Sequence, residues 1–424
     1  MLGGSRLWRH PDFLKLWSGQ TISVIGGEIT VLALPTLAIL QFHTSALVIG
    51  LLVGTQRLPF LVLTLFTGVL ADRVRRRPLM IIADAGRAIA LASIPLASIP
   101  LAFLLNGLTL AQLFVVALCM GVGNVLFDIA YLAYLPSLVG QADIVEGNNK
   151  LNTSFSIALL AGPGLGGVLV QAIGAARTIG INAFSYVISV LTLLWIREPE
   201  PLPRKLGAQS SVMAELREGI RLVFHHPLLR SLLAMMTSLS IAEQLALPIY
   251  LVFFYRRLHL TPAEAGIIFA AFGVGALVGS LLSSRLVATL GLGRAILVGV
   301  SGSPVGLAMI PLALFLPPVP WLCFANFVAA VAITVMDIQQ VSLRQSLTPS
   351  RLQGRMNATF RTFFWGVWPL ANFAGGFLAD RIGFVPTFLI AAGVGLLPVI
   401  IVIATPIGRL RSHAEVAPER AQPG

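Results

Sequence analysis

Apolar stretches of about 20 residues or more recur along the whole chain, with short polar segments between them. A helix needs roughly 20 apolar residues to cross the hydrocarbon core of a bilayer. At that length the pattern predicts twelve membrane-spanning helices. They cover residues 13–40, 46–70, 78–104, 108–135, 151–173, 178–196, 228–254, 263–288, 295–316, 319–343, 356–379 and 384–405.

Composition favours the same fold class, an all-α membrane protein. Of the 424 residues, 56% are hydrophobic and 11% are Asp, Glu, Lys or Arg. A soluble domain carries about 25% charged residues, so a water-facing globule is excluded. The net charge of +12 is compatible with a nucleic-acid partner as well as with a membrane topology. The position of the basic residues distinguishes the two.

Of the 29 Lys and Arg residues, 23 fall in segments on one side of the predicted membrane and four on the other. Short cytoplasmic loops of membrane proteins carry such an excess of basic residues. We therefore expect a multi-pass protein of the cell (inner) membrane, with both termini in the cytoplasm. The basic excess is explained by topology and by contact with membrane lipid, and no nucleic-acid partner is expected.

The longest polar stretch, residues 197–227, divides six predicted spans from six. This division predicts an N-terminal six-helix bundle (1–196), a cytoplasmic linker (197–227), a C-terminal six-helix bundle (228–406) and a cytoplasmic tail (407–424). Within the linker, Val212, Leu216, Ile220 and Val223 recur at helical spacing, which predicts an amphipathic helix along the inner membrane surface. A docking site for a regulatory partner is the alternative interpretation.

The two halves resemble each other in sequence. With an offset of 209 residues, the segment 128–174 has 12 identities in 47 positions, including Asp128 with Asp337 and Gly166-Gly167 with Gly375-Gly376. Predicted spans 1 and 7 also match, with Glu28 opposite Glu243. The chain is therefore a duplicated six-helix unit. Transporters built from parallel repeats bind substrate near the bilayer midplane, between two halves that rock against each other.

Two motifs resemble those of a known family. The segment Gly68-Val-Leu-Ala-Asp72-Arg73-Val-Arg75-Arg76-Arg77, between predicted spans 2 and 3, is similar to the loop signature of the major facilitator superfamily. In span 5, Ala158-Leu-Leu-Ala-Gly162-Pro163-Gly-Leu-Gly166-Gly167 resembles the antiporter motif of its drug-exporting members. Leu352-Gln353-Gly354-Arg355-Met-Asn357 is similar to sequences of the branch that holds siderophore exporters and macrolide efflux pumps. The resemblance covers nearly the whole chain and implies the major facilitator fold, two pseudo-symmetric six-helix bundles.

The resemblance also implies roles for both motifs. Gly68, Asp72, Arg73, Arg76 and Arg77 are expected to form a conformational switch that locks one access state; the alternative is a plain positive-inside anchor. The family usually has Gly at the place of Arg75. In span 5, Gly162, Pro163, Gly166 and Gly167 are expected to form a bend that favours exchange. Independently of the family, small residues let helices approach closely and proline bends a helix.

Charges inside the predicted spans cost at least about 2.5–3.5 kcal/mol each, so they mark functional sites. Glu28 is the preferred proton-coupling or cation-binding group, with Glu243 as its partner across the pathway; neutral, hydrogen-bonded acids are the alternative. Arg57 has no acid nearby in sequence, so it pairs with one on another helix, with Glu28 a candidate, or binds an anionic substrate. Asp84 and Arg87 are spaced for an ion pair on one helix, and with Asp128 and Asp337 they are expected to serve as inner-gate charges.

One departure from the family concerns the coupling ion. Many proton-coupled drug exporters carry an arginine in span 4, four residues before a glycine, where this chain has Ala117 before Gly121. The sequence also has no catalytic set, no ATP-binding loop and no metal-ligating cluster, so neither an enzyme nor a cofactor is expected.

The resulting prediction is a secondary active transporter. It is expected to export a small amphipathic compound (a drug, an antibiotic or a siderophore) by alternating access, in exchange for protons, and to work as a monomer. The alternatives are a lipid or lysolipid flippase, an importer on the same fold, and a membrane sensor that transports nothing.

Overall fold

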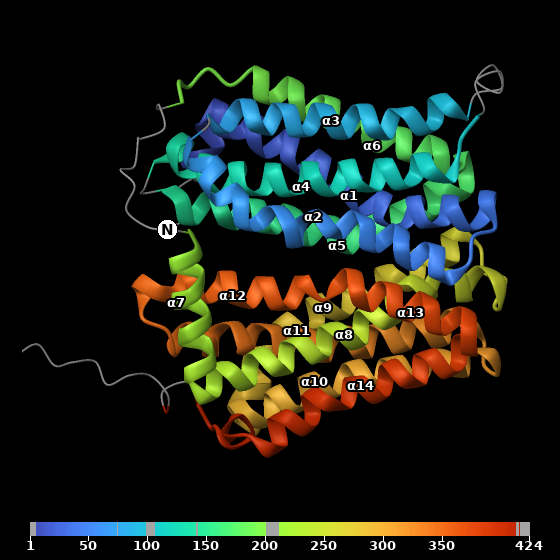
Figure 1. Ribbon diagram of the computed structural model, residues 1–424, viewed down its shortest axis with the longest axis vertical. Coiled ribbons are helices and arrows are strands. Elements are labelled where there is room, and N and C mark those ends of the chain that lie inside the picture. Colours follow the sequence, from blue (N-terminus) through green and yellow to red (C-terminus); the bar gives the residue numbers. More distant parts are fainter. Residues whose placement is uncertain are drawn as a thin grey trace, which may run out of the picture. The chain divides into compact units, whose positions relative to one another are not determined.

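The computed structural model describes residues 6–73, 75–98, 107–140, 143–200, 212–412 and 415 (Figure 1). Of residues 6, 64–73, 132, 212–216 and 350 it describes the backbone alone. Every regular element in these ranges is a helix. The α-helices are α1 (Pro11–Phe42), α2 (Ala46–Arg73), α3 (Arg76–Ala97), α4 (Leu110–Val139), α5 (Ile144–Ile173), α6 (Ala175–Leu194), α7 (Val212–His225), α8 (Pro227–Arg256), α9 (Pro262–Leu290), α10 (Leu292–Met309), α11 (Pro318–Ser346), α12 (Gln353–Gly366), α13 (Trp368–Ile382) and α14 (Phe384–Ala404). Short 3-10 segments lie at Arg6–Arg9, Ile310–Leu314, Ser350–Leu352 and Pro406–Arg409.

Eleven helices of the described part are long and apolar enough to cross a membrane. The remaining predicted span, 356–379, was expected to be one helix, and that expectation is wrong. The structure divides it into α12 and α13, which meet at Val367. Pro369 lies at the start of α13, where it has no N–H to donate to the preceding turn and its ring blocks a straight continuation. The two pieces together supply the twelfth span, so the all-α, twelve-span fold is confirmed.

The helices form two compact units. Unit 1 comprises Met1–Thr44, Leu52–Gln209 and Leu260–Ala270, and unit 2 comprises Ser45–Leu51, Ser210–His259 and Ala271–Gly424. In unit 1, α1 packs against α5 and α6, and α3 packs against α4 and α6. In unit 2, α8 packs against α13 and α14, and α10 packs against α11 and α14. Two helices change unit along their length, since the first turns of α2 belong to unit 2 and those of α9 to unit 1.

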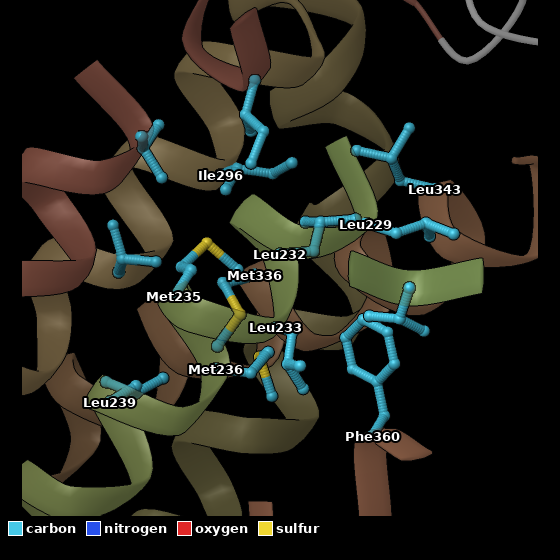
Figure 2. Packing of buried hydrophobic residues seen from close by; sticks show 14 of the residues in the cluster. Leu229, Leu232, Leu233, Met235, Met236, Leu239, Ile296, Met336, Leu343 and Phe360 are labelled. Atoms are coloured by element: carbon cyan, nitrogen blue, oxygen red, sulfur yellow. The ribbon is translucent and has the colours of Figure 1, made fainter. Parts of the chain in front are cut away.

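Each unit has its own apolar core. Figure 2 shows the core of unit 2, where Met235, Met236 and Leu239 of α8 meet Met336 of α11 and Phe360 of α12. All these side chains are buried. The interior of a bundle of membrane helices is held by such close packing, because lipid tails are as apolar as the side chains themselves.

The linker contains the helix α7, and the described apolar side chains of its last turns pack on protein. Val223 is fully buried in the core of unit 2, and Phe224 contacts Phe363 of α12 with ring centroids 5.7 Å apart. Gly219 lies against the backbone of Arg355, and Glu218 forms an ion pair with Arg355. The helix therefore packs on α12 and α8, and Val223 does not contact lipid.

Single glycines join three helix pairs of the described part without a loop, one of them Gly291 between α9 and α10. Gly174 connects α5 to α6 and Gly383 connects α13 to α14, with φ of 85° and 91° and ψ of 155° and 170°. This backbone region is essentially restricted to glycine. The two positions are related by the 209-residue offset, so both halves make the same sharp joint.

Replacing Gly383 with alanine should lower the free energy of unfolding by about 1–3 kcal/mol, the usual cost of forcing an L-residue into this region. Denaturant-induced unfolding of the purified protein in detergent measures the change. Gly86→Ala in α3 is the matched control, because an added Cβ there meets nothing within 4 Å. That control should be neutral or slightly stabilising. Equal stabilities of Gly383→Ala and wild type would contradict the prediction.

Candidate functional site

A polar cavity of about 190 Å³ lies inside unit 1, among helices α1, α2, α3, α4 and α6. Four charged side chains line it: Glu28, Arg57, Arg87 and Asp128. The uncharged lining residues are Gln20, Ser23, Val24, Gly27, Thr30, Val31, Gln56, Phe60, Met120, Asn124, Phe127 and Tyr186. The cavity thus brings together four of the residues that the sequence singles out, each on a different helix.

Glu28 lies on α1 at a point where α5 packs closely against it. Gly162 of α5 faces the Glu28 side chain so directly that an added Cβ would overlap the Cβ of Glu28. Four residues further on, Gly166 packs on the backbone of Ile29. These glycines let α5 approach α1 closely. The predicted antiporter motif and the predicted coupling acid are therefore in direct contact.

Arg57 of α2 has two acidic neighbours on other helices. It interacts electrostatically with Glu28 of α1 and with Asp128 of α4. The sequence suggested Glu28 as a partner and did not suggest Asp128. With all three groups ionised, the two carboxylates and one guanidinium carry a net charge of −1.

Asp84 and Arg87 form the ion pair on α3 that their spacing allows. Both side chains are almost fully buried, at 0% and 5% exposed. Ser189 of α6 donates to Asp84 Oδ2 at 2.5 Å, and Arg87 Nη1 donates to Asn124 Oδ1 of α4 at 2.7 Å. All of these residues belong to unit 1.

Aromatic rings enclose the guanidinium of Arg87. Its Cζ lies 4.8 Å from the ring centroid of Phe127 and 4.4 Å from that of Tyr186. Cation–π contacts of this kind add to the hydrogen bonds in holding a buried cation. The network ties α3, α4 and α6 together at one wall of the cavity.

Unit 2 contains an acidic pair related to that of unit 1 by the repeat. Glu243 of α8 interacts electrostatically with Asp337 of α11. Gln340 Nε2 donates to Asp337 Oδ1 at 3.5 Å. The side chain of Asp337, like that of Asp128 in unit 1, is exposed in the structure. Each unit thus holds a glutamate on its first spanning helix and an aspartate on its fourth.

Comparison with known proteins agrees with this architecture. The family model described as "Transmembrane secretion effector" matches residues 6–423. The chain belongs to this family of major facilitator transporters. Family members are transporters and not enzymes, so the expected fold family and the non-enzymatic class are both confirmed.

Among curated relatives of this transporter is the "Multidrug efflux pump Tap" of Mycolicibacterium fortuitum, 29% identical over 95% of this chain and 97% of the relative. The "Enterobactin exporter EntS" of Citrobacter koseri is 27% identical over 99% of this chain and 97% of the relative. Among solved structures, the nucleoside transporter NupG has a TM-score of 0.70 at 14% identity, covering 93% of this chain and 98% of that chain. A bacterial homologue of the iron transporter ferroportin has a TM-score of 0.70 at 18% identity, with the same coverage.

The motif that is predicted to form a switch loop lies only partly within the described residues. Gly68, Asp72 and Arg73 fall in the last turns of α2, whose side chains lie outside the described residues. Arg76 Nη1 donates to the carbonyl of Ala133 in α4 at 3.0 Å. The Arg77 guanidinium donates to the carbonyls of Leu193 and Leu194 in α6, both at 2.8 Å. Arg77 thus binds the last turn of α6, where backbone carbonyls lack intrahelical donors.

Two acids that bind backbone N–H groups near the linker are not predicted by the sequence. Glu200 accepts hydrogen bonds from the backbone N–H groups of Arg76 and Arg77, at 2.6 and 3.1 Å, and so caps α3. Asp12 Oδ2 accepts from the backbone N–H groups of residues 197 and 198 at 3.0 and 2.8 Å. Both carboxylates fix the start of the linker to unit 1. Their only signal in the sequence is an acid in a basic segment, which does not indicate the partner.

Proposed function

We propose that this transporter exports a small amphipathic compound across the cytoplasmic membrane in exchange for protons. The observation that carries the proposal is the cavity of unit 1, where Glu28 and Asp128 flank Arg57. Because Asp84 neutralises Arg87, the other basic residue of the lining, an excess of one negative charge remains. A site with this charge attracts either a proton or a cationic group of a substrate. Competition between the two for the same carboxylates gives exchange in opposite directions.

The size of the cavity defines what it accommodates. Binding sites for drug-sized ligands measure about 300–1,000 Å³. At about 190 Å³, the cavity holds a charged group of the compound, with Phe60 and Phe127 offering apolar contacts beside it. An amphipathic cation combines both properties.

Two further observations support export. Relatives that span nearly the whole chain are named as an efflux pump and an exporter. The glycine face of α5, which resembles the motif of drug-exporting antiporters, lies directly against Glu28. The proposal also includes alternating access, cytoplasmic termini and a monomeric protein surrounded by lipid.

Two measurements test the proposed function. The first is susceptibility to cationic drugs, and secretion of siderophores, in a host from which other efflux pumps are deleted; expression of the chain should raise tolerance or secretion. The second uses proteoliposomes with an internal pH indicator. Transport of an added cationic dye such as ethidium should drive protons across the membrane in the opposite direction. A chain that moves no solute in either direction overturns the proposal in favour of a sensor. Movement of lysolipid alone, or uptake instead of export, supports the flippase or the importer.

A further inference from the structure

The two units carry the same pair of acids in different surroundings. Glu28 and Asp128 line the cavity of unit 1, where both interact electrostatically with the guanidinium of Arg57. The repeat places Glu243 and Asp337 at the matching positions of unit 2. What the acids of unit 2 bind depends on whether that unit has a basic residue to match.

In unit 2, a serine stands at the position of Arg87. An offset of 216 residues relates α3 to α10, since six of the seven residues Leu91–Ala97 recur 216 positions later. The same offset puts Ser303 of α10 at the position of Arg87 and Val300 at that of Asp84. The ion pair of unit 1 is thus replaced as a whole by two uncharged residues, which leaves the net charge of unit 2 unaffected.

A glycine stands at the position of Arg57. The offset of 216 residues also relates α2 to α9, because Leu61-Val62 recurs as Leu277-Val278. It puts Gly273 of α9 at the position of Arg57. Unit 2 therefore repeats the two carboxylates of unit 1 without the cation that accompanies them there.

One acid of unit 2 has a basic partner of a different origin. Arg344 follows Asp337 by seven residues on α11 and interacts electrostatically with it. Arg361 of α12 is exposed and acts on Arg344. Glu243 interacts with Asp337 and forms no ion pair with a basic residue of the described part. With both acids and Arg344 ionised, the group carries a net charge of −1, which one monovalent cation neutralises.

Uncharged oxygen atoms lie beside both acids. Ser303 is next to Glu243, and Gln340 Nε2 donates to Asp337 Oδ1 at 3.5 Å. Ser303 and Gln340 are each only 3% exposed. Within the described part of the chain, Ser303 Oγ, Gln340 Oε1 and Glu243 Oε1 are buried without a hydrogen-bond partner. Buried polar atoms in native proteins are nearly always paired, so three such atoms near one another indicate a bound group.

A metal cation fits these atoms better than a proton does. A proton on Glu243 supplies one hydrogen-bond donor, whereas three oxygens lack a partner. A hard cation contacts several carboxylate, amide and hydroxyl oxygens at once. Acids within membrane spans commonly mark ion pathways, which agrees with a cation at this place.

We propose that unit 2 binds one monovalent metal cation through side-chain oxygens of Glu243, Ser303 and Asp337. Gln340 holds Asp337 in place and offers its amide oxygen as a further ligand. The ion takes the electrostatic place that the guanidinium of Arg57 takes in unit 1. Asp337 is exposed, so an ion can reach the pair. The inference goes beyond the proposed export function and does not depend on what the cavity of unit 1 carries.

Thermal unfolding of the purified protein in detergent measures this binding, because an ion that binds only the folded state raises the unfolding midpoint. Choline chloride is replaced stepwise by sodium chloride or potassium chloride at constant ionic strength. The midpoint should rise saturably with at least one of the two salts. In Glu243→Gln, the salt concentration that gives half of the rise should increase at least tenfold, because ligand charge sets the affinity of such sites. In Ser303→Ala it should increase about three- to tenfold, since one uncharged ligand is lost.

Glu218→Gln is the matched control in the same unit. Glu218 lies on α7 and pairs with Arg355, and its replacement should leave the half-effect concentration unchanged. A rise that occurs with calcium chloride at concentrations far below those of both monovalent salts overturns the monovalent assignment.

Two other results overturn the proposal. If neither monovalent salt gives a saturable rise with the wild type, the acids of unit 2 share a proton instead. If the rise persists in Glu243→Gln and disappears in Glu28→Gln, the ion belongs to unit 1. Should Glu243→Gln fail to fold, Ser303→Ala decides, because it removes a single uncharged oxygen. None of these measurements requires transport, so a failure of the proposed export function would leave them valid.

Discussion

Replacing Glu28 with glutamine should abolish the coupling between substrate and proton movement. The amide has almost the shape of the carboxyl group, so α5 can still pack on α1 through Gly162. An amide, however, neither binds nor releases a proton near neutral pH. We expect substrate-driven proton flux in proteoliposomes to fall at least tenfold, to the level of passive leak. An imposed pH gradient should drive ethidium export by the wild type and have no effect on the variant.

Glu146→Gln is the matched control for this prediction. Glu146 lies in the first turn of α5 and pairs with Lys150 at 3.4 Å, outside the cavity. Its replacement by glutamine should leave coupled transport unchanged. Coupled transport that persists in Glu28→Gln would remove Glu28 from the mechanism. Glu243→Gln, made in parallel, distinguishes whether the related acid of unit 2 takes part.

Replacing Arg87 with methionine should destabilise the protein by about 3–5 kcal/mol, because Asp84 would remain buried without its cation. Asp84 is 0% exposed, and its remaining donor is the Ser189 hydroxyl. Methionine is a long apolar side chain that can follow the course of the arginine stem, so lost volume is a small part of the effect. Denaturant-induced unfolding in detergent measures the loss.

The double variant Asp84→Leu, Arg87→Met separates charge from packing. Replacing a buried ion pair by apolar residues of similar volume is often neutral or stabilising, so the double variant should regain most of the stability lost by Arg87→Met. If the pair serves only the structure, transport recovers as well. Recovered stability without recovered transport would assign the pair a role in gating. A double variant as unstable as the single one would show that the hydrogen bonds of Asn124 and Ser189 dominate instead.

Hydropathy predicted the spanning helices because length and apolar content are properties of a single segment. It missed the break at Val367 because a proline alone does not identify a break. Pro35, Pro163 and Pro248 lie inside continuous helices, whereas Pro369 ends one helix and begins another. Whether neighbouring groups compensate for the lost hydrogen bond depends on contacts with other helices, which the sequence does not contain.

For the candidate site as well, the sequence indicates single residues but not the contacts between them. Glu28 and Arg57 stand out because a charge in a spanning helix is costly wherever it lies, and Asp84 and Arg87 because helical spacing is local. Asp128 as a neighbour of Arg57 and Glu200 as a cap of α3 are contacts between distant segments. In the sequence, Asp128 stands out as a charge within a span but carries no sign of its partner, and Glu200 looks like any other acid that follows a helix.

The one-residue joint at Gly174 has a mechanical consequence. Because only Gly174 separates α5 from α6, there is no flexible loop to absorb a tilt of α5. We therefore expect such a tilt to move the start of α6. The first helix carries Gly162, in contact with Glu28, and the second carries Ser189 and Tyr186, which hold the Asp84–Arg87 pair. We therefore expect the two helices to move together, so that a shift of α5 at Glu28, the proposed coupling acid, reaches the Asp84–Arg87 pair in the same unit.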